Sequence, residues 1–85
     1  MNYTNLTASA LIKTGFGKVA GFTVNSNTSG TLKLWDNTSA ATTVITNTYT
    51  FAAGSQVVRF PEPICFNTGL YATIGGTADV TIVWE

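Results

Sequence analysis

The 85-residue chain contains no histidine, and this absence removes several kinds of chemistry. Nucleophilic Ser-His-Asp and Cys-His sites use an imidazole as general base, and many metal sites use it as a ligand. The only cysteine, Cys65, lies between Ile64 and Phe66, and we expect this apolar setting to keep its thiol buried and unreactive. With one cysteine, no disulfide can form within the chain.

Charged residues are also scarce: four Lys and Arg and four Asp and Glu make up 9% of the chain, against ~25% in typical soluble domains. Four dispersed cations do not form a phosphate-binding surface, so we expect no nucleic-acid partner. No apolar run approaches the ~20 residues of a membrane span, so we expect no membrane partner. The first residues lack the charged and then apolar layout of a signal peptide, which predicts a protein made and used without export.

The few acidic residues each have a structural explanation. Asp36 begins a turn, Glu62 stands between two prolines, and Asp79 follows a Gly-Gly pair. No loop holds the several carboxylates that Ca²⁺ prefers. We therefore predict no enzymatic activity, no metal and no cofactor. The alternative is a pair of carboxylates brought together by distant strands, as in glycosidases.

Short runs of β-branched and aromatic residues fill the sequence, separated by Gly, Asn, Ser and Pro, and no stretch has a helical period. We expect about eight short strands, near residues 6–14, 17–24, 31–36, 43–51, 56–60, 64–66, 70–75 and 78–84. Such regular spacing predicts an all-β fold, an antiparallel, jelly-roll-like β-sandwich. Residues 11–85 would form this single domain. Residues 1–10 would be a flexible tail or an arm that adds to a neighbour's sheet edge.

Two pairs of turn-forming residues suggest how the strands connect. Gly75-Gly76 stands between two alternating strands and can supply the positive φ angles of a tight turn, so we expect a terminal β-hairpin. Pro61 and Pro63 lack the backbone N–H of a sheet ladder, so we expect a sheet edge and a crossing of the chain there.

Alternation along the strands assigns faces to the aromatic residues. If Leu32 and Leu34 point inward, Lys33 and Trp35 point outward, and an outward Trp often marks a contact surface. The alternative is a bulge that turns Trp35 into the core. Trp84 alternates in phase with other apolar residues, so we expect it in the core.

We expect protein interfaces at Trp35 and Tyr71, with Tyr3 of the N-terminal arm as a third contact. The alternative for these aromatic residues is a platform that stacks on sugar rings, as in small carbohydrate-binding β-sandwiches.

The segments 31–39 (TLKLWDNTS) and 65–80 (CFNTGLYATIGGTADV) resemble small all-β structural proteins of tailed bacteriophages. The resemblance covers roughly the C-terminal two thirds of the chain. It implies a non-enzymatic virion protein made in the host cytoplasm and located on the capsid surface. Such a decoration or cement protein stabilises the phage head as a homo-oligomer, often a homotrimer, by contacts with the major capsid protein. The alternative is a carbohydrate- or host-surface-binding module of a tail fibre or baseplate.

Overall fold

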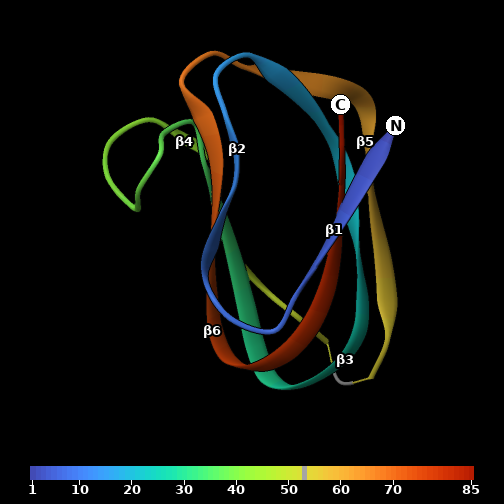
Figure 1. Ribbon diagram of the computed structural model, residues 1–85. Helices are drawn as coiled ribbons and strands as arrows, with labels where there is room; N and C mark the ends of the chain where they lie inside the picture. Colours follow the sequence, from blue (N-terminus) through green and yellow to red (C-terminus); the bar gives the residue numbers. More distant parts are fainter. Residues whose placement is uncertain (53) are drawn as a thin grey trace.

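The computed structural model describes residues 1–52 and 54–85 and shows one open antiparallel sheet of six strands (Figure 1). The strands are β1 (Asn2–Leu6), β2 (Ala10–Thr14), β3 (Gly17–Trp35), β4 (Val44–Thr50), β5 (Gln56–Phe66) and β6 (Gly69–Trp84). The all-β antiparallel class predicted from the sequence is therefore confirmed. The described part of the chain includes no helix able to span a membrane.

The long strands β3 and β6 form the centre of the sheet and pair from Val19 opposite Trp84 to Trp35 opposite Tyr71. Both strands bend in the middle, where their register shifts, so the sheet folds over on itself (Figure 1). One half contains β1, the C-terminal part of β6, the N-terminal part of β3, and β5. The other contains β2, the remaining parts of β6 and β3, and β4. We call them the β1/β5 half and the β2/β4 half.

The core lies between the two halves because each long strand alternates between buried and exposed residues. In β6 the buried side chains are all even-numbered, and β3 contributes residues from both of its parts. The fully buried larger side chains are Val19, Val24, Leu32, Leu34, Phe66, Leu70, Val80 and Ile82.

Trp84 packs against the edge of this core. Its indole Nε1 donates a hydrogen bond of 2.9 Å to Thr4 Oγ1. The Nζ atom of Lys13, which belongs to the opposite half, lies 5.7 Å from the centre of the Trp84 ring. The inward direction expected for Trp84 is thus confirmed, although the ring stays partly exposed.

The expected terminal hairpin is wrong, because Gly75 and Gly76 lie inside one continuous strand. The residues on both sides of the glycines pair with β3 and not with each other, with Gly75 opposite Thr31 and Thr77 opposite Thr28. Gly76 has a φ of 68°, and a Cβ there would overlap the backbone carbonyl of Ser29. The glycine is needed for a bend packed against a neighbouring strand, which requires the same φ freedom as a turn.

Bends within continuous strands also explain why the structure has six strands and not the eight expected. Residues 25–30, expected as a turn, bend within β3, so segments expected as separate strands are continuous. Conversely, the expected strand 6–14 is divided between β1 and β2. All six strands belong to one sheet, so the two separate sheets of a jelly-roll sandwich are not shown. The turn expected at 52–55 includes residue 53, which lies outside the described residues.

Two further expectations concern the ends of the sheet. Pro61 and Pro63 lie on the edge strand β5, as expected, and β5 continues past them to Phe66 while still paired with β3. The prolines are accommodated in a register shift, where residues 60–63 stand opposite Ala20 alone. At the other edge, residues 2–6, from the segment considered a tail or arm, form β1 and pair with this chain's own β6.

Candidate protein-contact surfaces

An apolar row crosses the outer face of the β2/β4 half. Tyr71 of β6 stands opposite both Leu11 of β2 and Trp35 of β3, and Trp35 stands opposite Val44 of β4. Directly opposed residues share one face of a sheet, and the neighbouring Leu34 is buried, so these four side chains point outward together. Leu11 and Val44 are each 44% exposed. We call Leu11, Tyr71, Trp35 and Val44 the outer row.

Trp35 is held in place within this row. Its Nε1 donates a hydrogen bond of 2.9 Å to Thr73 Oγ1, and the Nζ atom of Lys33 lies 4.3 Å from the ring centre. Trp35 therefore lies on the outer face as the alternation predicts, and it does not turn into the core. A ring already fixed by a hydrogen bond and a cation–π contact loses little conformational entropy when a partner covers it.

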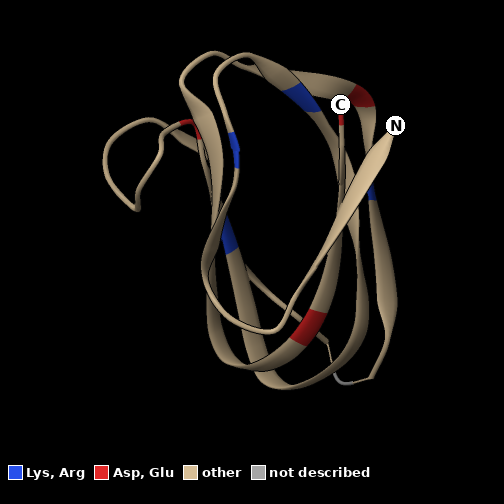
Figure 2. Cartoon of the chain, viewed as in Figure 1, with Lys and Arg blue, Asp and Glu red and all other residues tan. Residues whose placement is uncertain are grey.

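The few charged residues are scattered over the fold (Figure 2), and two of the carboxylates are held by neutral amide groups. Asp36 accepts hydrogen bonds from the backbone N–H groups of Asn67, Thr68 and Gly69, the shortest being 2.8 Å from Thr68. Burial acts to raise the pKa of Asp36, but these three N–H groups outweigh it and lower the pKa. The sequence suggested that Asp36 serves its own turn. Instead it fastens a loop more than thirty residues away.

Asp79 is held on the outer face of the β1/β5 half. Its carboxylate accepts hydrogen bonds from the Nδ2 atoms of Asn5 at 2.6 Å and Asn25 at 3.1 Å. These two bonds lower the pKa of Asp79. Lowered pKa values keep Asp36 and Asp79 ionised at neutral pH, which disfavours either as a general acid. Within the described residues, no three Asp, Glu, Cys or His side chains gather into a metal-binding group.

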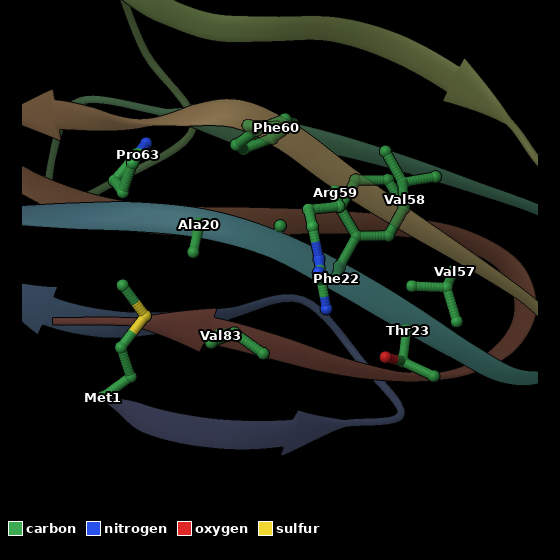
Figure 3. A pocket seen from close by; sticks show the side chains of 11 residues that line it. Met1, Ala20, Phe22, Thr23, Val57, Val58, Arg59, Phe60, Pro63 and Val83 are labelled. Carbon is green, nitrogen blue, oxygen red and sulfur yellow. The ribbon is translucent and has the colours of Figure 1, made fainter.

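A second apolar surface lies on the outer face of the β1/β5 half. Tyr3 is 74% exposed and stands opposite Val83, and Val57 and Met1 are 68% and 66% exposed. Beside Val83 the surface is hollowed to a volume of 340 Å³, with Arg59 in the middle (Figure 3). The structure thus brings Trp35 and Tyr71 together and places Tyr3 on the other half.

Several of these features were missed by sequence reasoning. Leu11 and Val44 belong to the outer row only because of their pairing register, which local patterns do not reveal. The hollow depends on Gly21 standing opposite Arg59, again a matter of register. The expectation that Cys65 is buried is wrong: its side chain is exposed on the edge strand β5, where Phe66 is the buried residue.

Comparisons of the chain with known protein families, with curated protein sequences and with solved structures gave no match.

Proposed function

We propose that this protein is a non-enzymatic structural component of a phage virion, a capsid decoration or cement protein that stabilises the head. The observation that supports this best is the presence of exposed apolar side chains on the outer faces of both halves of the sheet. A protein that joins neighbouring shell subunits needs two separate contact surfaces. The outer row supplies one, and the surface around Tyr3 and Val57 supplies the other.

The size and charge of the chain support this proposal. A domain of this length buries only somewhat more than ~60% of its unfolded surface, so contacts between subunits would add stability that the core alone lacks. The formal net charge is zero, so copies of the chain repel one another little. In this proposal the two halves act as the two layers of the jelly-roll-like β-sandwich expected from the sequence, each with one face toward a neighbour.

The partners in this proposal are further copies of the chain, as a homotrimer, and the major capsid protein. The protein would be made in the host cytoplasm and located on the capsid surface, with no nucleic-acid, membrane or cofactor partner. Light scattering followed by co-sedimentation with undecorated capsids tests the proposal. An oligomer that sediments with capsids supports it, and a monomer that stays in the supernatant contradicts it.

Substitutions in the outer row test the proposed contact surface. Leu11→Asp places a charge at the edge of the row, while Thr14→Asp places the same charge at another exposed position of β2. We expect Leu11→Asp and Trp35→Ala to weaken oligomerisation or capsid binding, and Thr14→Asp to leave both intact. If Trp35→Ala changes neither property, the outer row is not an interface.

A carbohydrate- or host-surface-binding module of a tail fibre or baseplate is the second candidate. Trp35 and Tyr71, which stand opposite each other on one face of the sheet, favour it, since sugar faces stack on aromatic rings. Lys33 lies over the Trp35 ring and would have to move for a sugar to stack on the face it covers. A glycan array without hits would contradict this candidate.

A further inference from the structure

The hollow on the β1/β5 half exists because its central strand lacks a side chain at one position. Gly21 of β3 stands opposite Arg59 of β5. Gly21 has a φ of 152°, and a Cβ there would overlap the carbonyl oxygen of Val58. The fold therefore requires glycine at this position. No side chain covers the outer face of β3 there, so the neighbouring side chains surround a hollow.

The side chain of Arg59 extends from β5 across β3, toward the side where Val83 lies (Figure 3). The hollow around it is lined largely by apolar side chains, including Met1, Val57, Pro63 and Val83. Thr23 adds one hydroxyl group to the lining. A guanidinium group is thus presented on an apolar surface that is open to a partner.

Arg59 differs from Lys13 and Lys33 in that no aromatic ring among the described residues is in contact with its charged group. Lys13 and Lys33 each lie over a tryptophan ring, whereas Arg59 is exposed and forms no ion pair within the described residues. A planar guanidinium binds a carboxylate through two parallel hydrogen bonds. Apolar surroundings strengthen such a bond once a partner excludes water.

We propose that this hollow binds an acidic, aliphatic segment of a partner protein, with an aliphatic side chain against Val57 and Val83 and an adjacent carboxylate on Arg59. We choose an acidic, aliphatic partner segment because of charge complementarity: a single cation at the centre of an apolar hollow matches a single anion flanked by apolar groups. Two of the four side-chain carboxylates of a second copy, Asp36 and Asp79, are already held by amide groups, which leaves only Glu62 and Glu85 for the hollow. If the function proposed above holds, the segment belongs to the major capsid protein.

The test uses three peptides as probes: acetyl-Ser-Ile-Asp-Ser-amide, the same peptide with Asn in place of Asp, and the same peptide with Ala in place of Ile. Binding is followed by two-dimensional NMR of the whole chain. We expect the first peptide to shift the backbone amide signals of Gly21, Thr23, Val57 and Val83. The other two peptides should bind more weakly.

Two variants identify the cation responsible. Arg59→Gln should weaken binding of the first peptide about tenfold, the factor expected when a charge-assisted hydrogen bond is lost. Lys18→Gln removes one positive charge from β3 outside the lining of the hollow and should leave binding unchanged. The proposal is overturned if no signal around the hollow shifts, if the Asn peptide binds equally well, or if both variants bind like the original chain.

Capsid co-sedimentation separates this proposal from the function on which its partner depends. If the chain binds the acidic peptide through Arg59 but does not sediment with capsids, the hollow is a carboxylate site and the capsid function fails. If Arg59→Gln still sediments with capsids as the original chain does, the capsid function holds and the hollow is not its contact. A dimer that forms without peptide and that the acidic peptide dissociates, seen by light scattering, would show that a second copy is the occupant, and would overturn the choice of partner.

Discussion

Replacement of Gly75 by Ala tests whether β6 is a bent strand paired with β3 or one side of a hairpin. In the bent strand, a Cβ at residue 75 would lie 2.5 Å from Oγ1 of Thr31 on the neighbouring strand. In a hairpin, residue 75 would stand in a tight turn that does not depend on Thr31. The two arrangements therefore differ in whether residues 75 and 31 are energetically coupled.

The structure sets the expected size of the effect. Favourable carbon contacts begin near ~3.5 Å, so the Thr31 hydroxyl must rotate away or the strands must separate. Threonine is stiff about χ1, and overpacking of this kind costs about 1–3 kcal/mol. Replacing Gly by Ala also stabilises by about 0.4–1 kcal/mol through the unfolded chain. We expect Gly75→Ala to lower the free energy of unfolding by about 1 kcal/mol.

The Thr31→Ala background removes the clashing hydroxyl. In this background, Gly75→Ala should be neutral or stabilise by up to about 1 kcal/mol, which gives a coupling energy of about 1–2 kcal/mol. Urea unfolding followed by tryptophan fluorescence measures all four chains of this cycle. A coupling below about 0.5 kcal/mol, at equal denaturant slopes, would refute the pairing of Gly75 with Thr31.

Three further predictions concern the core and the two carboxylates that amide groups hold. Leu34 is fully buried, so Leu34→Ala should lower the free energy of unfolding by about 2–5 kcal/mol. The whole chain is expected to have a free energy of unfolding of roughly 4–13 kcal/mol, at ~0.05–0.15 kcal/mol per residue. A loss below about 1 kcal/mol, measured by calorimetry, would contradict the packing of Leu34. Asp36→Ala should cost about 1–2 kcal/mol and speed hydrogen exchange at the Thr68 amide. Unchanged exchange there would show that the carboxylate does not hold the loop. Folding lowers the pKa values of Asp36 and Asp79 below their ordinary value of 3.8. Both carboxylates therefore stabilise the folded chain fully at a pH well above 3.8, and this stabilisation is lost as the pH falls through their pKa values in the folded chain. Acid unfolding of Asp79→Asn should show a smaller loss than the original chain, and an equal loss would mean that its bonds to Asn5 and Asn25 contribute nothing.

Much of the local structure follows from the order of residues. The alternation of Leu32, Lys33, Leu34 and Trp35 correctly predicts which side chains are buried and which lie outside. The absence of helical periods predicts the all-β class. These features depend on neighbours one or two residues apart, so a single sequence contains the information.

The candidate surfaces follow from the sequence only in part. Trp35 and Tyr71 were expected as contacts, and the structure places them opposite each other. That Leu11 and Val44 extend the same row depends on pairing between strands separated by dozens of residues. The hollow at Arg59 likewise requires the register that sets Gly21 opposite it.

The sequence by itself determined the strand-forming segments, the inner and outer faces and the scarcity of charge. It also marked the glycines as points where the backbone changes direction. Only the tertiary structure decided that Gly75 and Gly76 bend a continuous strand, because a turn and a bend need the same φ freedom and differ only in the strand that lies alongside. The tertiary structure also decided that Asp36 holds the loop at Thr68 and that Arg59 lies in an apolar hollow. Contacts between residues far apart in the chain are set by the packing of the whole sheet.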